Sequence, residues 1–407
     1  MRSEKMRRFL TVSALLITLF ASATALAKSQ ANIQSLDPDT QFYVPKPNHG
    51  ALDQISDLTS GGDKVNANLI KKVIGTPQAV WFTSGTPHGV QQAVKITVER
   101  AADQGEVPIL VAYNVPGRDC SQYSAGGAPT GDAYKAWIDG FAAGLGNHKV
   151  VVILEPDGLA LLPTDCGQPD TYDRVALINY AAHKLAGSDP NASLYLDAGH
   201  SAWHAVGDIA ARLVNGGVKD VQGFFSNLSN YRSTNYEVKF DTWISTCIAF
   251  ANNVDEGGWR LGHYDWCASQ YYSPFGPVDP NDISTWVYTD QWYDANLGHA
   301  VPTVHFVIDT SRNGQGPWTP PAHPAGDPQD WCNPPNRGLG LRPTANTGQP
   351  LLDAYLWVKI PGESDGQCYR WTNGPLDPVR NMQDPAAGQW FPKMALELVH
   401  KANPPLP

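Results

Sequence analysis

The sequence has few charged residues and, apart from its N-terminus, no basic run. Of its 407 residues, 17% are Asp, Glu, Lys or Arg, and the formal net charge is −10. Nucleic acids and anionic membrane surfaces attract clustered Lys and Arg side chains. The composition therefore argues against nucleic-acid and membrane partners and favours a neutral ligand.

Long apolar runs are also missing, with one exception at the N-terminus. Residues 1–27, MRSEKMRRFLTVSALLITLFASATALA, combine a basic start, an apolar middle and a small-x-small end. This pattern is typical of a cleaved secretory signal; a retained anchor, the alternative, would need a longer and less interrupted run. Cleavage would leave 407 − 27 = 380 residues of a secreted, extracellular protein. We expect an extended lead-in over 28–48 and a single domain over 49–407, because no linker or repeat divides the rest.

No CxxC or HExxH spacing is present, so the six cysteines do not indicate a metal cluster. All six follow the predicted signal, and an even number of cysteines in an exported chain indicates disulfides. Many pairings are possible. Nearest-neighbour order favours Cys120–Cys166, Cys247–Cys267 and Cys332–Cys368. We expect no metal and no cofactor.

Short apolar runs recur at intervals that leave room for a helix, as in GVQQAVKITVERAADQG between two of them. Alternating strands and helices predict a parallel sheet covered by helices, and seven such units favour a closed or nearly closed α/β barrel. Two segments, 232–300 and 312–347, look like long loops without clear helices, which are often functional. The seven runs are AVWF near Val80, PILVAYN near Leu110, VVVILEPD from Val150, SLYLDAG near Leu196, GFFSNLSN near Phe224, TVHFVIDTS near Val307 and AYLWVKIPG near Leu356.

Acidic residues follow the predicted strands. Because the carboxyl ends of barrel strands meet at one rim, these side chains should face one pocket. A single acid there is often a helix N-cap, and Asp309 could form a structural ion pair with Arg312. Several acids at one rim repel one another, which separates their pKa values as acid–base chemistry requires. The residues at these ends are Asp119, Asp157, Asp197, Asp309, Lys359, Glu363 and Asp365.

Aromatic residues accompany the acids at the same strand ends. Pyranose rings present flat C–H faces that pack on aromatic rings, so acids with aromatics suggest glycoside hydrolysis. Trp266 and Trp292 add aromatic rings to the long segment 232–300, whereas core packing is the simpler interpretation for Trp137, Trp243 and Trp357. The residues at the strand ends are Trp81, Tyr113, Trp203 and Trp331.

Several motifs together resemble those of glycoside hydrolase family 6, the cellulases, from about Trp81 to Pro405. They are AYNVPGRDC, VVVILEPDGLALL, LYLDAGHSAWH, SNLSNY, DTSRNG, DWCNPPNRGLGLRPTANTG and WVKIPGESDG. The resemblance implies a distorted seven-stranded α/β barrel that hydrolyses β-1,4-glucosidic bonds with inversion. It also matches two of the three disulfides, and Cys247–Cys267 lies outside the family pattern.

The resemblance further implies roles for individual residues. Asp157 is similar to the general acid, Asp119 to the neighbour that raises its pKa and orders the catalytic water, and Asp365 to the proposed base. Asp197 is similar to an acid that supports substrate binding. The remaining substrate-binding positions implied are Trp81, Tyr113, Ser124, Trp203, Trp331, Lys359 and Glu363.

The mode of cleavage depends on the loops around the site. The segment 367–387 is longer than in the most open family members and shorter than in processive ones, and we expect it to permit internal cutting. A cellobiohydrolase acting at chain ends is the alternative. We also expect the protein to be a monomer. Two other classes of protein are possible. A non-catalytic carbohydrate-binding protein would lack Asp119, Asp157 or Asp365, and all three are present. A lysine-dependent aldolase would use Lys359 to form a Schiff base with a carbonyl substrate.

Overall fold

The computed structural model describes residues 36–276 and 278–407. The predicted secretory signal and the first part of the lead-in lie outside the described residues. Residues 36–48 contain no helix or strand and make one isolated bridge, from Phe42 to Val107.

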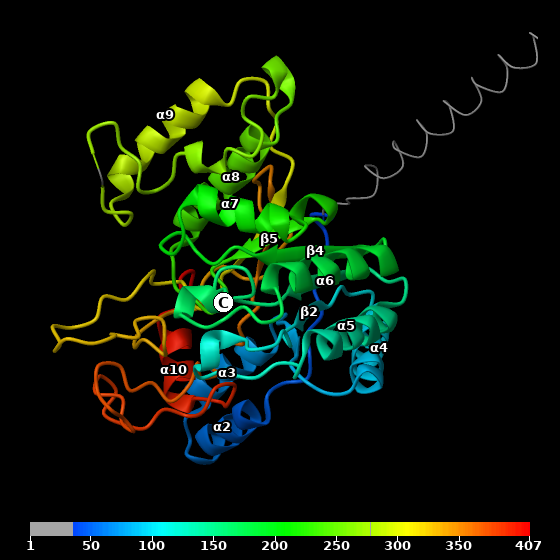
Figure 1. Ribbon diagram of the computed structural model, residues 1–407. Coiled ribbons are helices and arrows are strands. Elements are labelled where there is room, and N and C mark those ends of the chain that lie inside the picture. The colour runs from blue at the N-terminus through cyan, green and yellow to red at the C-terminus, as the bar shows by residue number, and fades with distance from the viewer. Residues whose placement is uncertain (1–35, 277) are drawn as a thin grey trace, which may run out of the picture. The chain divides into compact units, whose positions relative to one another are not determined.

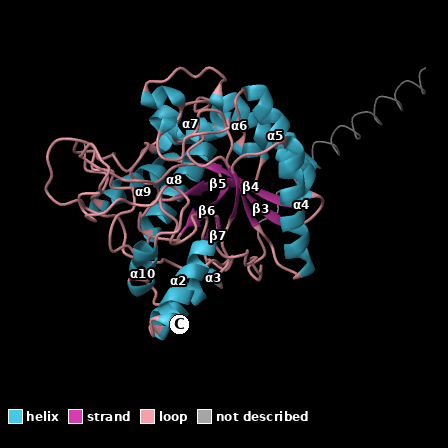
Figure 2. Ribbon diagram, turned by 90° about the horizontal axis from the view of Figure 1, so that it is seen from below, coloured by secondary structure: helices cyan, strands magenta, loops and turns pink. Residues whose placement is uncertain are grey.

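Seven parallel strands form a single sheet, as predicted, and they follow chain order from one edge to the other. Each strand pairs in parallel with the next, and helices surround the sheet (Figure 2). The strands are β1 (Val80–Phe82), β2 (Ile109–Ala112), β3 (Val150–Leu154), β4 (Ala192–Asp197), β5 (Gly223–Ser226), β6 (His305–Asp309) and β7 (Leu352–Leu356).

The two edge strands, β1 and β7, nearly close the sheet into a barrel. The Ala79 backbone N–H, just before β1, donates to the Trp357 carbonyl just after β7 at 3.0 Å. The Trp81 indole N–H donates to the Val358 carbonyl at 2.9 Å. The fold is therefore a curled sheet whose edges meet through few contacts. This is the nearly closed barrel that the strand pattern predicts and the distorted barrel that the family resemblance implies.

Alternate strand residues point into the barrel and out toward the helices. Val111, Ile153 and Val307 belong to the interior cluster, whereas their neighbours Leu110 and Val152 pack with the helices. A side chain two residues further along a strand points the same way. The inward direction of Ile153 and Val307 thus continues into Glu155 and Asp309, which places carboxylates at the end of the apolar barrel.

Two helices lie inside the segment 232–300, so the expectation of a loop without helices is wrong there. Helix α8 is buried on most of its surface, including the polar residues Glu237 and Asp241. A helix buried all round lacks the apolar stripe by which helices are recognised in a sequence. The segment 312–347, by contrast, contains no helix or strand. The helices are α2 (His49–Ser60), α3 (Lys64–Ile74), α4 (Pro87–Asp103), α5 (Gly131–Leu145), α6 (Arg174–Ser188), α7 (Val206–Asn215), α8 (Thr234–Ala251), α9 (Trp286–Asn296) and α10 (Pro392–His400).

Helices α2, α3 and α10 come from opposite ends of the chain and pack together over Trp357, which is fully buried (Figure 1). Within the residues that the structure describes, no helix is long and apolar enough to cross a membrane.

The three disulfides are those that nearest-neighbour order favours. Cys120 pairs with Cys166, Cys247 with Cys267, and Cys332 with Cys368, and no cysteine is free. The second bridge joins α8 to the segment that follows it.

Helices α4 and α5 pack closely because α5 has glycines at the contact. A Cβ atom at Gly140 would lie 2.2 Å from the Pro87 carbonyl oxygen, which is backbone and cannot swing aside. Gly187, on the exposed side of α6, has nothing within 4 Å of its Cβ position.

We expect Gly140→Ala to destabilise the protein by about 1–3 kcal/mol, because α4 must move away from α5. Gly187→Ala is the matched control and should stabilise by roughly 0.5–1 kcal/mol, since alanine restricts the unfolded chain. Urea unfolding of both variants measures the difference. Equal stability of the two variants would show that the close contact is unimportant.

Candidate active site

The loops after β2 and β3 carry two acids in a backbone conformation that is rare outside glycine. Asp119 has a φ of 58° and Asp157 a φ of 62°. Asp adopts this left-handed region more readily than most residues, and such positions concentrate at functional sites. Neither acid caps a helix, so the N-cap interpretation is wrong for both: Thr130 caps α5 and Asp173 caps α6.

Asp157 lies in a buried group of acids. Burial raises the pKa of Asp157 well above its usual range, and the charges of Asp197 and Asp119 raise it further. Burial also raises the pKa of Asp197 to about 6, although Asp197 accepts hydrogen bonds from the Ala160 and Gly199 backbone N–H groups at 2.9 and 3.1 Å. The structure thus brings Asp119, Asp157 and Asp197 together, as their strand-end positions predict.

Tyr113 and Ser124 complete this side of the site. Burial and then the charges of Asp157 and Asp119 raise the pKa of Tyr113, so this residue lies within the electrostatic reach of both acids. The Ser124 backbone N–H donates to Asp119 at 2.5 Å. The Arg118 guanidinium lies 4.4 Å from the centre of the Tyr113 ring and fixes its position.

Glu155, directly after β3, binds the backbone of the loop that carries Asp119 and was not predicted as a site residue. Its carboxylate accepts hydrogen bonds from the Asn114 and Val115 backbone N–H groups at 2.9 and 3.0 Å. Burial raises the pKa of Glu155 to about 7. Arg174 donates to the Pro116 carbonyl at 2.8 Å, so the loop after β2 is held at two points. The inward alternation of β3 was the signal that could have identified Glu155.

Asp365 has the opposite environment, because cations surround it. Its carboxylate oxygen Oδ2 accepts from the Arg312 guanidinium and the Asn333 backbone N–H, both at 2.9 Å, and from the Tyr231 hydroxyl at 3.2 Å. Lys359 lies 3.4 Å from Oδ1. Burial works to raise the pKa of Asp365, but Arg312 and Lys359 outweigh it, and the pKa is lowered. This carboxylate stays ionised at neutral pH.

Arg312 therefore pairs with Asp365, so the alternative interpretation of Asp309 as its ion-pair partner is wrong. Asp309 instead accepts from the Ser311 and Lys359 backbone N–H groups at 2.9 and 3.0 Å. Glu363 lies beside Lys359 and accepts from the Asn48 side chain at 2.7 Å. Burial raises the pKa of Glu363, and the Lys359 charge opposes that shift.

Two aromatic residues connect the Asp157 side to the Asp365 side. The Trp81 ring meets Tyr113 edge-on at 5.6 Å, and its N–H reaches the Val358 carbonyl next to Lys359. Tyr123, near Asp119 in sequence, packs against Gly366, because a Cβ atom there would lie 2.4 Å from the Tyr123 ring. The Asp119 loop and the Asp365 loop are thus in contact.

The other aromatic residues named from the sequence have different surroundings. The Trp331 and Tyr123 ring centres are 5.9 Å apart. Trp292 is packed against the hydrophobic core and meets Phe250 at 5.3 Å, so it is not a loop aromatic. Trp137, Trp243 and Trp357 are buried in the core, as predicted.

Trp203 lies on the turn after β4, and two buried acids of α8 that were not predicted hold this turn and the end of β5. Both oxygens of Glu237 on α8 accept from the Ser201 backbone N–H, at 3.1 and 3.3 Å. Asp241, one turn along α8, accepts from the Ser226 hydroxyl at 2.6 Å. Burial raises the pKa of Glu237 to about 7. Burial and the Glu237 charge raise the pKa of Asp241 well above its usual range, which favours the protonated form of this carboxyl group.

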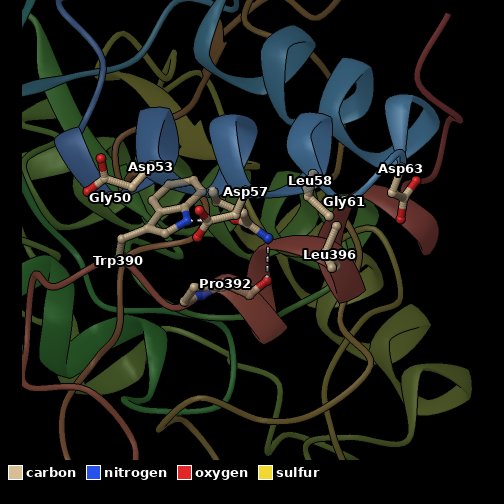
Figure 3. Close-up of a pocket in the computed structure, with 10 residues that line it drawn as sticks. Gly50, Asp53, Asp57, Leu58, Gly61, Asp63, Trp390, Pro392 and Leu396 are labelled. Carbon is tan, nitrogen blue, oxygen red and sulfur yellow. Dashed lines mark hydrogen bonds between the residues drawn. The ribbon is translucent and has the colours of Figure 1, made fainter.

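Two pockets differ in their relation to these residues. One of about 450 Å³ includes Tyr123, Gly366 and Tyr369 in its lining and adjoins the Asp365 loop. Another of about 600 Å³ lies between α2 and α10 and is lined by Trp390 and three aspartates, none of which is a predicted site residue (Figure 3). The first pocket belongs to the candidate site and the second does not.

One group of potential metal ligands occurs among the described residues, formed by Cys368, Asp377 and Asp384. The Cys368 sulfur is bonded to Cys332, and Asp377 forms an ion pair with Arg370 at 2.8 Å. These partners already occupy two of the three candidate ligands.

An α/β barrel with acids of opposed ionisation at its strand ends, flanked by aromatic rings, is the arrangement of a glycoside hydrolase. A model of the glycosyl hydrolases family 6 matches residues 37–402, and the chain belongs to that family.

Relatives with known names include enzymes of two kinds. Endoglucanase 1 of Streptomyces sp. (strain KSM-9) is 37% identical over 74% of this chain and 67% of its own length. Endoglucanase A of Thermobispora bispora is 32% identical over 99% and 71%. A probable 1,4-beta-D-glucan cellobiohydrolase C of Aspergillus terreus is 32% identical over 72% and 59%.

Among solved structures, the endoglucanase Cel6 from Mycobacterium tuberculosis aligns with a TM-score of 0.65 at 32% identity, covering 89% of this chain and 98% of that one. The cellobiohydrolase Cel6A from Chaetomium thermophilum aligns with a TM-score of 0.61 at 25% identity, covering 90% and 98%.

The buried Glu237–Asp241 pair leads to a prediction on stability. Because the folded-state pKa of Glu237 is raised, the folded protein binds more protons than the unfolded chain between about pH 4.5 and 7, and this stability is lost as pH rises. Glu237→Gln should therefore stabilise the protein at pH 8 by about 1–3 kcal/mol and have little effect at pH 4. Chemical unfolding at both values measures this. The same change at both pH values would contradict a raised pKa of Glu237 in the folded protein.

Proposed function

We propose that the protein is a secreted, inverting β-1,4-glucanase that cuts cellulose or soluble β-1,4-glucans internally. The single observation that supports this most strongly is the opposed ionisation of Asp157 and Asp365. Glycoside hydrolysis with inversion needs one protonated carboxyl group to protonate the leaving oxygen and one ionised carboxylate to activate water. Burial and neighbouring acids raise the pKa of Asp157 and favour its protonated form, and two cations lower the pKa of Asp365 and favour its ionised form.

In this proposal Asp157 donates its proton to the glycosidic oxygen. Asp197 and Asp119 keep that proton on Asp157, because a second negative charge nearby would be costly. Asp365 takes the proton of the attacking water through an intervening water. Its oxygen Oδ2 already accepts three hydrogen bonds, which leaves Oδ1 as the oxygen that receives the proton. Inversion follows because the water attacks the face of the sugar opposite the leaving group.

The proposed substrate contacts follow from exposure and chemistry. Trp81, Trp203 and Trp331 are half-buried and offer ring faces to pyranose units, and Tyr113 packs on the sugar nearest Asp157. Lys359, Glu363 and Asp197 supply polar groups for hydroxyls, and Ser124 holds Asp119 for the catalytic water.

The role of Asp119 can be tested through the pH dependence of the rate. A general acid must be protonated, so activity falls as pH rises through its pKa. Removing the Asp119 charge lowers the pKa of Asp157, and Asp119→Asn should move the alkaline limb of kcat toward lower pH by roughly one unit.

Asp132→Asn is the control, because Asp132 is exposed on α5 and loses the same charge away from Asp157. Asp157→Ala should lose nearly all activity while still binding cello-oligosaccharides. An unchanged alkaline limb in Asp119→Asn, with weaker binding only, would make Asp119 a substrate contact.

Internal cutting is supported by the endoglucanase names of the bacterial relatives at 37% and 32% identity. One observation favours the second candidate, a cellobiohydrolase. Tyr123 donates to the Gln329 side chain at 3.2 Å and meets Tyr369 at 5.9 Å. The loops around Asp119, Gln329 and Tyr369 are therefore in contact, as the roof over a tunnel would require.

A time course on carboxymethylcellulose separates the two candidates by following viscosity and new reducing ends together. We expect a steep fall in viscosity with few new ends, because internal cuts shorten polymers most. Slow viscosity loss, with cellobiose released from amorphous cellulose, would show the cellobiohydrolase instead. New ends on neither substrate would overturn the proposed glucanase activity.

A further inference from the structure

An exposed pair of tryptophans lies outside the residues assigned above. Trp259 and Trp266 are 49% and 43% exposed, and their ring centres are 5.7 Å apart with a 36° angle between the planes. Both belong to the segment after α8, which the disulfide Cys247–Cys267 ties to that helix. An exposed indole presents a large apolar surface to water, and a ligand that covers this surface removes it from water. Adjacent exposed indoles therefore often mark binding surfaces.

Both rings are held in place before any ligand arrives. The Arg260 guanidinium lies 4.8 Å from the Trp259 ring centre and 5.0 Å from that of Phe250, which is buried in the core. The His263 ring stacks on Trp266 at 3.6 Å with an interplanar angle of 12°. Each indole thus packs against a guanidinium or an imidazole group, and each tryptophan remains about half exposed. Rings fixed in this way lose little entropy when a ligand binds.

We propose that Trp259 and Trp266 form a second glucan-binding surface, outside the cleft, for a stretch of the same β-1,4-glucan polymer. This proposal rests on the proposed glucanase function. The spacing of the two rings is comparable to one glucose unit along such a chain. Pyranose C–H faces pack on indoles, and His263 and Asp265 beside the rings offer groups for hydroxyls.

The position of this segment favours a glucan over another occupant. Further along it, the Gln270 side chain donates to the Ser201 and His204 carbonyls at 3.0 and 2.8 Å. These two residues flank Trp203, the proposed platform at the cleft. The segment that carries the exposed pair is therefore in contact with the turn that carries Trp203. Cleavage of long or insoluble glucans would benefit, because the surface keeps the polymer near the acids.

Adsorption to amorphous cellulose tests this proposal. Trp259→Ala/Trp266→Ala is made in an Asp157→Ala background, so that cleavage does not consume the polymer. Protein depletion is measured at low temperature, with concentrations corrected for the lost indoles. We expect the double variant to bind about tenfold more weakly. Phe275→Ala is the matched control, since Phe275 is an exposed aromatic residue of the same segment outside the pair, and it should bind as before.

Adsorption of the double variant equal to that of its parent would overturn the proposal. So would an equal loss in Phe275→Ala, which would indicate unspecific surface adhesion. Sedimentation of the double variant tests another occupant of this surface. If the variant differs from its parent in oligomeric state but not in adsorption, a second copy of the chain covers the pair, and the proposal is wrong.

With Asp157 restored, the double variant should hydrolyse cellotetraose at the parental rate and amorphous cellulose more slowly. Loss on both substrates would mean that the tryptophans support the fold or the cleft. Absence of hydrolysis by the unmodified protein, with adsorption that depends on the tryptophans, would overturn the glucanase proposal and leave the binding surface intact.

Discussion

Each loop of the site is held by a buried carboxylate that comes from a different strand or helix. Glu155, after β3, binds backbone N–H groups of the β2 loop; Asp197, at the end of β4, binds one from the β3 loop. Asp309, at the end of β6, binds one from the β7 loop, and Glu237 on α8 binds one from the β4 loop. Buried charges are tolerated only when hydrogen bonds satisfy them, so these acids fix the loops and the loops keep the acids buried.

This cross-linking explains why the two sides of the site differ in charge. On the β2 to β4 side, the carboxylates meet backbone N–H groups and one another, so protonation relieves their repulsion. On the β7 side, Arg312 and Lys359 neutralise Asp365 directly. The pKa of the same residue type is therefore shifted in opposite directions, according to whether other acids or cations surround it.

The sequence predicts the strands well, because buried parallel strands are continuous apolar runs such as VVVIL in β3. It also predicts that Asp119, Asp157 and Asp197 meet, since they follow three neighbouring strands in chain order. The partner of Asp365 could not be predicted. Arg312 is 53 residues away, and nothing in the sequence distinguishes Asp365 from the closer Asp309 as its partner. Helix α8 and its buried acids were missed because residues buried all round leave no amphipathic pattern.

The seam between β1 and β7 has a mechanical consequence. Neighbouring strands elsewhere are joined by ladders of paired residues. Across this seam, among the described residues, one backbone hydrogen bond forms, from the Ala79 N–H to the Trp357 carbonyl. Widening the barrel there breaks far fewer bonds than separating any other two strands. Trp81 lies on one side of the seam, and Lys359 and the Asp365 loop lie on the other. A change in the girth of the barrel at this seam therefore also changes the distance between Trp81 and the side of the site that carries Lys359.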